Sequence, residues 1–137
     1  MQYLTLIHID PALLAELPDA EYARLMRGCF EKADALKQTG CLQDSQQLDN
    51  PETARTLRVR DGISRVTDGP FAETREFLAG FNLIEAASMD QAMQIARQFP
   101  WARFGSIEVR PVRDMQAVRG QVGASDDAPG NQAASRG

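Results

Sequence analysis

Histidine, cysteine and tryptophan are scarce in this chain, and each shortage excludes a class of site. Its 137 residues include one histidine, His8, one tryptophan and two cysteines, Cys29 and Cys41. The two cysteines do not form the spaced pairs that a zinc site or a disulfide framework requires. We therefore expect no zinc and no cofactor, although an oxygen-ligated cation at Asp10 or Asp68 stays open.

Basic charge and long apolar runs are also lacking. A net charge of −4 and a pI near 5.0 argue against nucleic acid or an anionic membrane surface as the main partner. The apolar runs are too short to span a bilayer, and no secretory signal is visible at the N-terminus. We expect a reduced, cytoplasmic setting. The sequence also has no glycine-rich phosphate loop, nucleophile elbow or haem signature.

The length predicts one domain, followed by a tail of different composition. We expect residues 1–115 to form the folded domain. Residues 116–137 are rich in glycine, alanine, serine and glutamine, and their few apolar side chains cannot offset the entropy of ordering them. This low-complexity tail is therefore expected to be disordered.

The apolar pattern predicts a β-α-β-β-β-α-β order, in which the two strands of a hairpin count as one elaboration. Residues 2–9 read as a strand that is apolar on both faces, which implies a strand covered on both sides. A helix is expected from Asp19, as N-cap, to Thr39, and a second one after a capping box of Ser88 and Gln91. The remaining strands are expected near residues 41–48, 56–60, 63–67, 80–86 and 106–112.

This order predicts an α+β, ferredoxin-like fold, in which both helices cover one face of an antiparallel sheet. The other face would be bare, and the first strand is apolar on that side too. A monomer would expose more apolar area than solubility usually allows. We therefore expect a homodimer in which the same face of a second copy covers the sheet.

The segment Asp68-Gly69-Pro70-Phe71 predicts an irregular loop of fixed shape, because glycine permits unusual backbone angles and proline fixes φ. Asp68 can accept hydrogen bonds from the amides of the loop. It can instead point into a cavity as an acid, a base or a cation ligand. Phe71 suits a core anchor better than a stacking surface, and Glu73 suits a solvated surface or a site about equally.

His8 and Asp10 lie two residues apart at the end of the first strand, so strand periodicity places them on one face. A carboxylate beside an imidazole suits a general acid or base. The simpler interpretation is a half-buried histidine at a strand end, with Asp10 opening the turn at Pro11.

Asp61-Gly62 lies between two alternating runs and predicts a tight hairpin. The implied register opposes Arg58 to Arg65 and groups them with Arg60, on the face opposite Leu57, Val59 and Val66. Opposed like charges are unfavourable unless a partner neutralises them. The partner is either a set of internal carboxylates (Glu73, Glu76 and Glu85) or solvent, or else an anionic ligand.

Three stretches together carry a family resemblance: residues 66–76, the pair Gly80-Phe81, and residues 107–112. They resemble the DGPF-domain branch of the YCII-related family, and the likeness covers about residues 2–112. It implies a dimeric α/β barrel with a cleft near the Asp68 loop. It also implies catalysis by a histidine and an aspartate, as in relatives that resemble lyases or dehalogenases. The helix after Asp19 has no histidine, so the catalytic histidine that the resemblance implies has no counterpart there. His8, on the first strand, is the only histidine that could take its place.

Two hypotheses follow. In the first, the chain is an acid–base enzyme for a small polar or anionic metabolite, with Asp68, His8 and Asp10 as catalytic residues. Arg58, Arg65, Phe71 and Glu73 would then bind the substrate. In the second, the chain is a non-catalytic ligand sensor or regulatory partner. The resemblance extends to proteins encoded beside extracytoplasmic-function sigma factors, so a sigma factor is the partner that this second hypothesis implies.

Overall fold

The computed structural model describes residues 1–70 and 74–124. The expectations for Phe71 and Glu73, and for the tail from residue 125 onward, lie outside the described residues. The main sheet has four antiparallel strands in the order β2-β5-β1-β6. Their bounds are β1 Gln2–Ile9, β2 Leu42–Gln47, β5 Phe77–Glu85 and β6 Gly105–Pro111.

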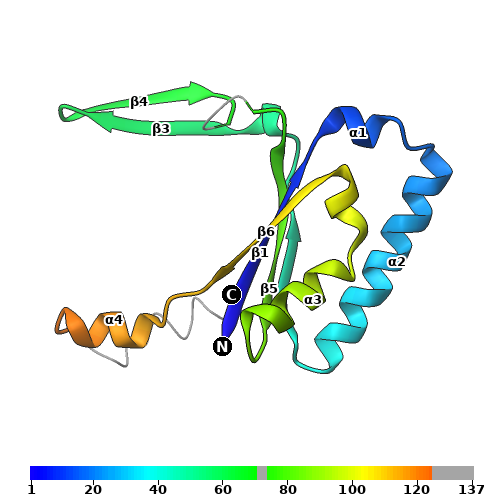
Figure 1. The fold of residues 1–137 in the computed structure, drawn as a ribbon. Helices are drawn as coiled ribbons and strands as arrows, with labels where there is room; N and C mark the ends of the chain where they lie inside the picture. The colour runs from blue at the N-terminus through cyan, green and yellow to red at the C-terminus, as the bar shows by residue number, and fades with distance from the viewer. Residues whose placement is uncertain (71–73, 125–137) are drawn as a thin grey trace.

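Two helices, α2 (Asp19–Gln38) and α3 (Met89–Arg97), lie on the same face of this sheet (Figure 1). The strand β5 separates β1 from β2, and β1 separates β5 from β6. Both βαβ units are therefore split, as in a ferredoxin-like fold. This confirms the α+β class and the placement of both helices. In the described part of the chain, no helix is long and apolar enough to cross a membrane.

The helix ends follow local chemistry. Ser88 accepts a hydrogen bond from the Gln91 backbone N–H at 3.1 Å, as the predicted capping box requires. The α2 helix differs from its prediction at its start: Pro18 is the N-cap, and Asp19 lies inside the first turn. There its carboxylate faces the positive end of the helix dipole.

A short helix that the sequence pattern did not predict, α1 (Pro11–Ala15), follows β1. Asp10 is its N-cap and accepts a hydrogen bond from the Ala12 backbone N–H at 3.0 Å, while Pro11 occupies the first turn. Asp10-Pro11 therefore begins a helix instead of a simple turn. Two 3-10 turns, η1 (Pro51–Thr53) and η2 (Pro100–Phe104), complete the connections.

The strands β3 (Arg55–Arg60) and β4 (Ile63–Asp68) form a separate two-stranded hairpin. Asp61 and Gly62 have φ angles of 54° and 74°, as a tight hairpin turn with two left-handed residues requires. Arg58 is opposite Arg65, which confirms the predicted register.

Helix α4 (Met115–Gln121) follows β6, with Asp114 as its N-cap. The tail that the sequence analysis begins at residue 116 thus starts within this helix, and its expected disorder stays a prediction. Asp114 accepts hydrogen bonds from the backbone N–H groups of Gln116 and Ala117, and this cap orders a segment with few apolar side chains.

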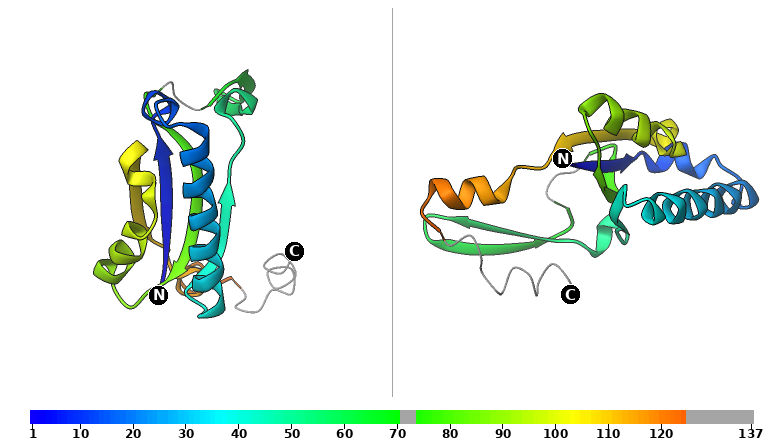
Figure 2. Two further views of the ribbon diagram at one scale, coloured as in Figure 1. Left: turned by 90° about the vertical axis from the view of Figure 1, so that its right-hand side faces the viewer. Right: turned by 90° about the horizontal axis from the view of Figure 1, so that it is seen from below.

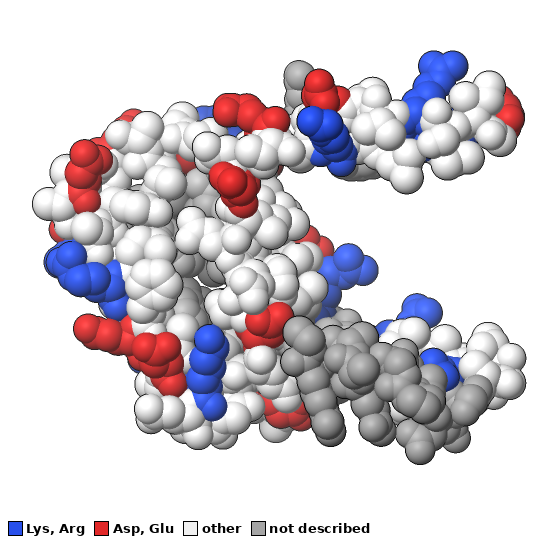
Figure 3. All heavy atoms as spheres, turned by 180° about the vertical axis from the view of Figure 1, so that it is seen from behind, with Lys and Arg blue, Asp and Glu red and all other residues white. Residues whose placement is uncertain are grey.

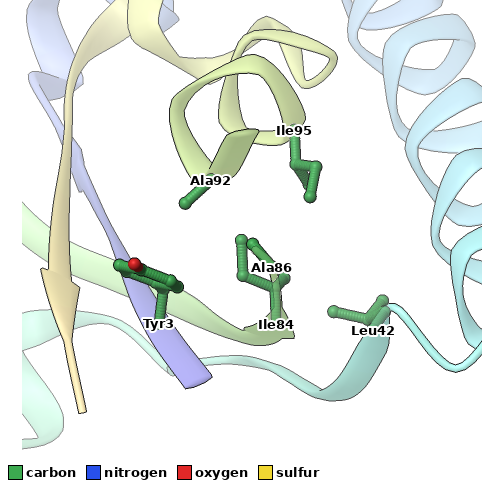
Figure 4. Packing of buried hydrophobic residues seen from close by; sticks show 6 residues of the cluster. All are labelled: Tyr3, Leu42, Ile84, Ala86, Ala92 and Ile95. Carbon is green, nitrogen blue, oxygen red and sulfur yellow. The ribbon is translucent and has the colours of Figure 1, made fainter. Parts of the chain in front are cut away.

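The buried core lies between the sheet and the helices (Figure 4). Tyr3, Ile84 and Leu42 form one row across β1, β5 and β2, and Ala92 and Ile95 of α3 cover it. The next row, Thr5, Asn82 and Ser45, is polar. The Thr5 hydroxyl donates to the Asn82 carbonyl at 3.4 Å, and the Ser45 hydroxyl donates to the Asn82 side chain at 2.6 Å.

No helix within residues 1–70 and 74–124 covers the opposite face of the sheet, here called the open face (Figures 1 and 2). Strand register places its six apolar and aromatic positions together: Leu4, Leu6, His8, Leu78, Phe81 and Leu83. The β3–β4 hairpin and α4 extend from the two ends of the sheet on this side, so the molecule has a C-shaped outline (Figure 1). We call the space between these two arms the hollow.

Candidate functional site

A cavity of about 250 Å³ lies on the helix side of the sheet, beside α2. We call it the α2 cavity. Its apolar and aromatic lining comes from β1, β5, α1, α2, the η2 turn and Leu48, which follows β2. The described residues that line it are Ile7, Ile9, Leu14, Tyr22, Met26, Cys29, Gln46, Gln47, Leu48, Asp49, Asn50, Phe77, Ala79, Gly80 and Trp101.

The cavity lies over the third row of the sheet, whose central position, Gly80, has no side chain. Ile7 of β1 and Gln47 of β2 both pair with Gly80 of β5, which presents no side chain to α2. A Cβ atom at Gly80 would lie 2.7 Å from the Gln46 carbonyl oxygen, so the close approach of β2 requires glycine here. A register shift in the β1–β5 pairing leaves Ala79 as an extra residue in β5, and Ala79 also lines the cavity.

Aromatic side chains form the opposite wall. The Trp101 ring lies 6.4 Å from Tyr22 of α2 and 6.2 Å from Phe104, both in tilted geometry. Such pairs hold an aromatic ring in one orientation. Trp101 is the only tryptophan of the chain, so its fluorescence reports on this cavity alone.

Cys29 of α2 also lines the cavity. Burial raises the pKa of its thiol, and a hydrogen bond from Trp101 acts in the opposite direction. Burial also raises the pKa of the Cys41 thiol, and the nearby Glu85 carboxylate adds to the increase. Neither thiol is therefore an activated nucleophile. Cys41 does not line the cavity.

Polar groups of the cavity gather at residues 46–50, where Gln46, Gln47, Asp49 and Asn50 contribute to the lining. The Asp49 carboxylate accepts a hydrogen bond from the Asn50 backbone N–H at 2.7 Å. No lysine, arginine or histidine is among the described lining residues. The cavity thus offers amide and carboxylate groups to a ligand, with no cationic group.

His8 lies on the other side of the sheet from this cavity. It is half-buried on the open face, between Leu78 of β5 and Ser106 of β6. Its Nε2 atom lies 3.5 Å from the Glu108 Oε1 atom. Beside it, the Ser106 hydroxyl donates to the Glu76 carboxylate at 2.6 Å. Sequence reasoning missed Ser106 and Glu108, because strand pairing brings them to His8 from nearly a hundred residues away.

Asp10 has a separate set of partners. Its side chain is only 6% exposed, and it accepts hydrogen bonds from the Ala12 backbone N–H and from Arg75 Nε at 2.9 Å. No hydrogen bond or ion pair joins Asp10 to His8 among the residues that the structure describes. The predicted interaction between His8 and Asp10 is thus replaced by two separate ones, His8 with Glu108 and Asp10 with Arg75. The Arg75 side chain is 83% exposed, so it covers the carboxylate from the solvent side.

Asp68 ends β4, and its side chain is 91% exposed. Arg55 Nε lies 3.9 Å from its carboxylate. Gly69 follows with a φ of 98°, and its backbone is held by hydrogen bonds to Ala54 and Thr56. Asp68 does not line the α2 cavity, and neither do Arg58 and Arg65 of the hairpin.

The carboxylates proposed to neutralise these arginines have other partners where they are described: Glu85 binds the N-terminal amine, and Glu76 binds Ser106. Within residues 1–70 and 74–124, no group of three or more His, Cys, Asp or Glu side chains could hold a metal ion. Those site residues named from the sequence that the structure describes therefore lie in three places: the open face, the start of α1, and the hairpin.

Comparison with known proteins places this geometry in a family. The YCII-related domain matches residues 1–116. An uncharacterized protein of Rhizobium meliloti (strain 1021) is 38% identical over 114 residues, which cover 82% of this chain and 92% of that protein. A solved structure covers 82% of this chain and 94% of its own, at 17% identity and a TM-score of 0.45. It is the 5-chloro-2-hydroxyhydroquinone dehydrochlorinase of Burkholderia phenoliruptrix in complex with 2,5-dihydroxybenzoquinone. So distant a likeness says nothing of this chain's activity.

Proposed function

The chain belongs to the YCII-related domain family, and on that premise we propose that it binds a small molecule in the α2 cavity. The observation that carries this proposal is the lining of the cavity: a mainly apolar and aromatic wall with a few polar groups at one end. Small-molecule sites in proteins have this composition. The absence of a large side chain at Gly80, where packing would otherwise fill the space, also supports a binding role.

Binding without chemistry at this cavity is the function that the geometry favours. The ionisable side chains among the described lining residues are Tyr22, Cys29 and Asp49. None of them forms a pair with a second acid or base there, as acid–base catalysis generally requires. A ligand-sensing module is therefore preferred over an enzyme that acts in this cavity. A sigma factor as its partner stays a prediction from the resemblance.

A thermal-shift screen of a metabolite library tests the proposal, because a ligand that binds only the native state raises the melting temperature. A true ligand should stabilise the wild-type protein and lose its effect in Ala79→Leu, which adds atoms to the cavity floor. Ala87→Leu is the matched control, since Ala87 is exposed and does not line the cavity. A library in which every stabilising compound acts equally on Ala79→Leu would contradict the proposal.

A second candidate function is acid–base catalysis at the open face. It is favoured by one observation, the meeting of His8, Glu108, Ser106 and Glu76 at the end of the sheet. Glu108 would orient the His8 ring, and the imidazole would exchange a proton with a substrate. Asp68, which the sequence suggested for this role, has no described contact with this group.

Turnover assays would separate the two functions once a ligand is known. His8→Asn should abolish turnover in the enzyme hypothesis and leave ligand binding in the α2 cavity unchanged. Asp68→Asn should have little effect on either. Product formation that survives in His8→Asn would exclude catalysis by this histidine.

We also propose that a second copy of the chain covers the open face. The apolar positions there form one continuous surface, and the arms at both ends carry further exposed apolar side chains: Leu57, Val59, Val66, Met115 and Val122. Figure 3 shows the hollow between the two arms, with mainly uncharged atoms on the described surface of the hairpin that faces it. An identical face would cover this surface symmetrically.

A further inference from the structure

We propose that the α2 cavity selects a flat, single-ring molecule without negative charge and rejects carboxylates and phosphates. This inference rests on the proposed binding function and specifies the class of ligand. It differs from the polar or anionic metabolite expected from the sequence, because the arginines on which that expectation depended lie on the hairpin, outside the cavity.

The charge of the ligand follows from the lining. The described residues around the cavity contribute the Asp49 carboxylate and no cationic side chain. An anion that entered would lose its hydration without gaining a guanidinium or ammonium partner, which is strongly unfavourable in an apolar site. It would also be repelled by Asp49, and the chain as a whole carries a net charge of −4.

The shape of the ligand follows from the two walls. One wall is the sheet, where the small residues Ala79 and Gly80 of β5 lie between the larger side chains of Ile7, Ile9 and Phe77. The other includes Trp101 and Tyr22, whose rings are held by mutual contact. A planar ring between these walls can stack on the aromatic side chains and lie against the glycine without a gap.

The size and orientation follow from the volume and the polar end. The volume of about 250 Å³ is below the roughly 300–1,000 Å³ of sites for drug-sized ligands, so one ring with a small substituent suits it. Among residues 46–50, Gln47, Asp49 and Asn50 supply amide and carboxylate groups. A neutral substituent that donates a hydrogen bond would therefore point toward this segment.

Four small probes test the inference: benzamide, benzoate, benzylamine and cyclohexanecarboxamide. The first three share one ring and differ in charge at pH 7, and the fourth keeps the amide on a puckered ring. Trp101 fluorescence measures binding. A second measurement is alkylation of Cys29 by N-ethylmaleimide, detected by mass spectrometry, with Cys41 as the internal control.

Benzamide should change Trp101 fluorescence and slow alkylation of Cys29 without affecting Cys41. Benzoate should bind at least about tenfold more weakly, because its charge would be buried without a partner. Cyclohexanecarboxamide should also bind more weakly than benzamide. Ala79→Leu should abolish the benzamide response and Ala87→Leu should keep it. If Ala79→Leu does not fold, the protection that benzamide gives Cys29 from alkylation in the wild-type protein still shows whether benzamide binds in the cavity.

Two kinds of result would overturn the inference. Benzoate that binds as tightly as benzamide or benzylamine, with protection of Cys29, would refute the charge selection and leave the proposed binding function intact. If no probe protects Cys29 or changes Trp101 fluorescence, the ligand class is wrong. If the metabolite library also yields no ligand sensitive to Ala79→Leu, the proposed function fails with it.

Discussion

Replacement of Leu57 by lysine should separate the expected dimer into monomers. Leu57 lies on the apolar face of the hairpin with Val59 and Val66, and its side chain is 64% exposed in the single chain. Burial of a whole leucine side chain contributes about 1.5–3 kcal/mol. The exposed two-thirds of Leu57 would therefore contribute about 1–2 kcal/mol in contact with a second copy.

Each substitution occurs twice in a symmetric dimer, so the loss is about 2–4 kcal/mol per dimer. This corresponds to a dissociation constant raised roughly 30- to 700-fold. The lysine charge adds to the loss wherever its ammonium group cannot reach water. The fold itself should change little, because Leu57 makes few contacts within one chain and lies on an exposed strand.

Analytical ultracentrifugation over a dilution series measures the dissociation constant, and far-ultraviolet circular dichroism checks the fold. Leu13→Lys is the matched control, since Leu13 is 40% exposed but belongs to α1, at the start of the helix layer. It should leave the dimer intact. A wild-type protein that is monomeric at high micromolar concentration would refute the proposal that a second copy covers the open face. An unchanged dissociation constant in Leu57→Lys would exclude the hairpin from the contact.

Three further predictions concern the single chain. Gly105→Ala should lower the free energy of unfolding, measured in urea, by about 3 kcal/mol, because the new Cβ atom would lie 2.0 Å from the His8 carbonyl oxygen. Gly28→Ala is the control: there is open space around Gly28, so this substitution should not destabilise the protein. Asp10→Ala should lower the free energy of unfolding in urea by about 2 kcal/mol, because it removes the α1 cap and the Arg75 contact. Asp10→Asn should lower it by about half as much, because asparagine keeps an acceptor for the cap. In a Cys41→Ser variant, alkylation of Cys29 should need higher pH in the folded protein than in urea, because burial raises the thiol pKa and so lowers the thiolate fraction; equal pH profiles would contradict this.

The parts of the fold that depend on residues close together in the sequence could be predicted. The β3–β4 register follows from Asp61-Gly62 alone, and the α3 start follows from Ser88 and Gln91, so both agree with the structure. The short helices α1 and α4 were missed because each has too few residues to show an apolar period. Their signals were single caps, Asp10 and Asp114, which are common in turns as well.

The α2 cavity could not be predicted, because it depends on which residues face one another across the sheet and α2. The one local signal was Gly80 within a strand-like run, since a glycine there suggests a bulge or a close backbone approach. The group of His8, Ser106 and Glu108 on the open face could not be predicted either, because only the pairing of β1 with β6 brings these residues together. The spacing of His8 and Asp10 suggested that the two side chains interact with each other. In the structure, His8 lies beside Glu108 and Asp10 binds Arg75.

The two faces of the sheet divide the proposed roles, and strand β5 links them. At the register shift, Ala79 lines the α2 cavity, while Leu78 pairs with His8 on the open face and is 38% exposed. A ligand and a second copy would thus contact adjacent residues of one bulged strand. A change in the backbone of β5 on one side must alter the packing on the other, since successive residues of a strand point to opposite faces. If binding in the cavity favours one geometry of the bulge, it changes the affinity of the dimer, and dimerisation changes ligand affinity by the same factor. A sensor would need such a connection between a small-molecule site and a protein surface, and the register shift at Ala79 is where the two proposed contact regions adjoin.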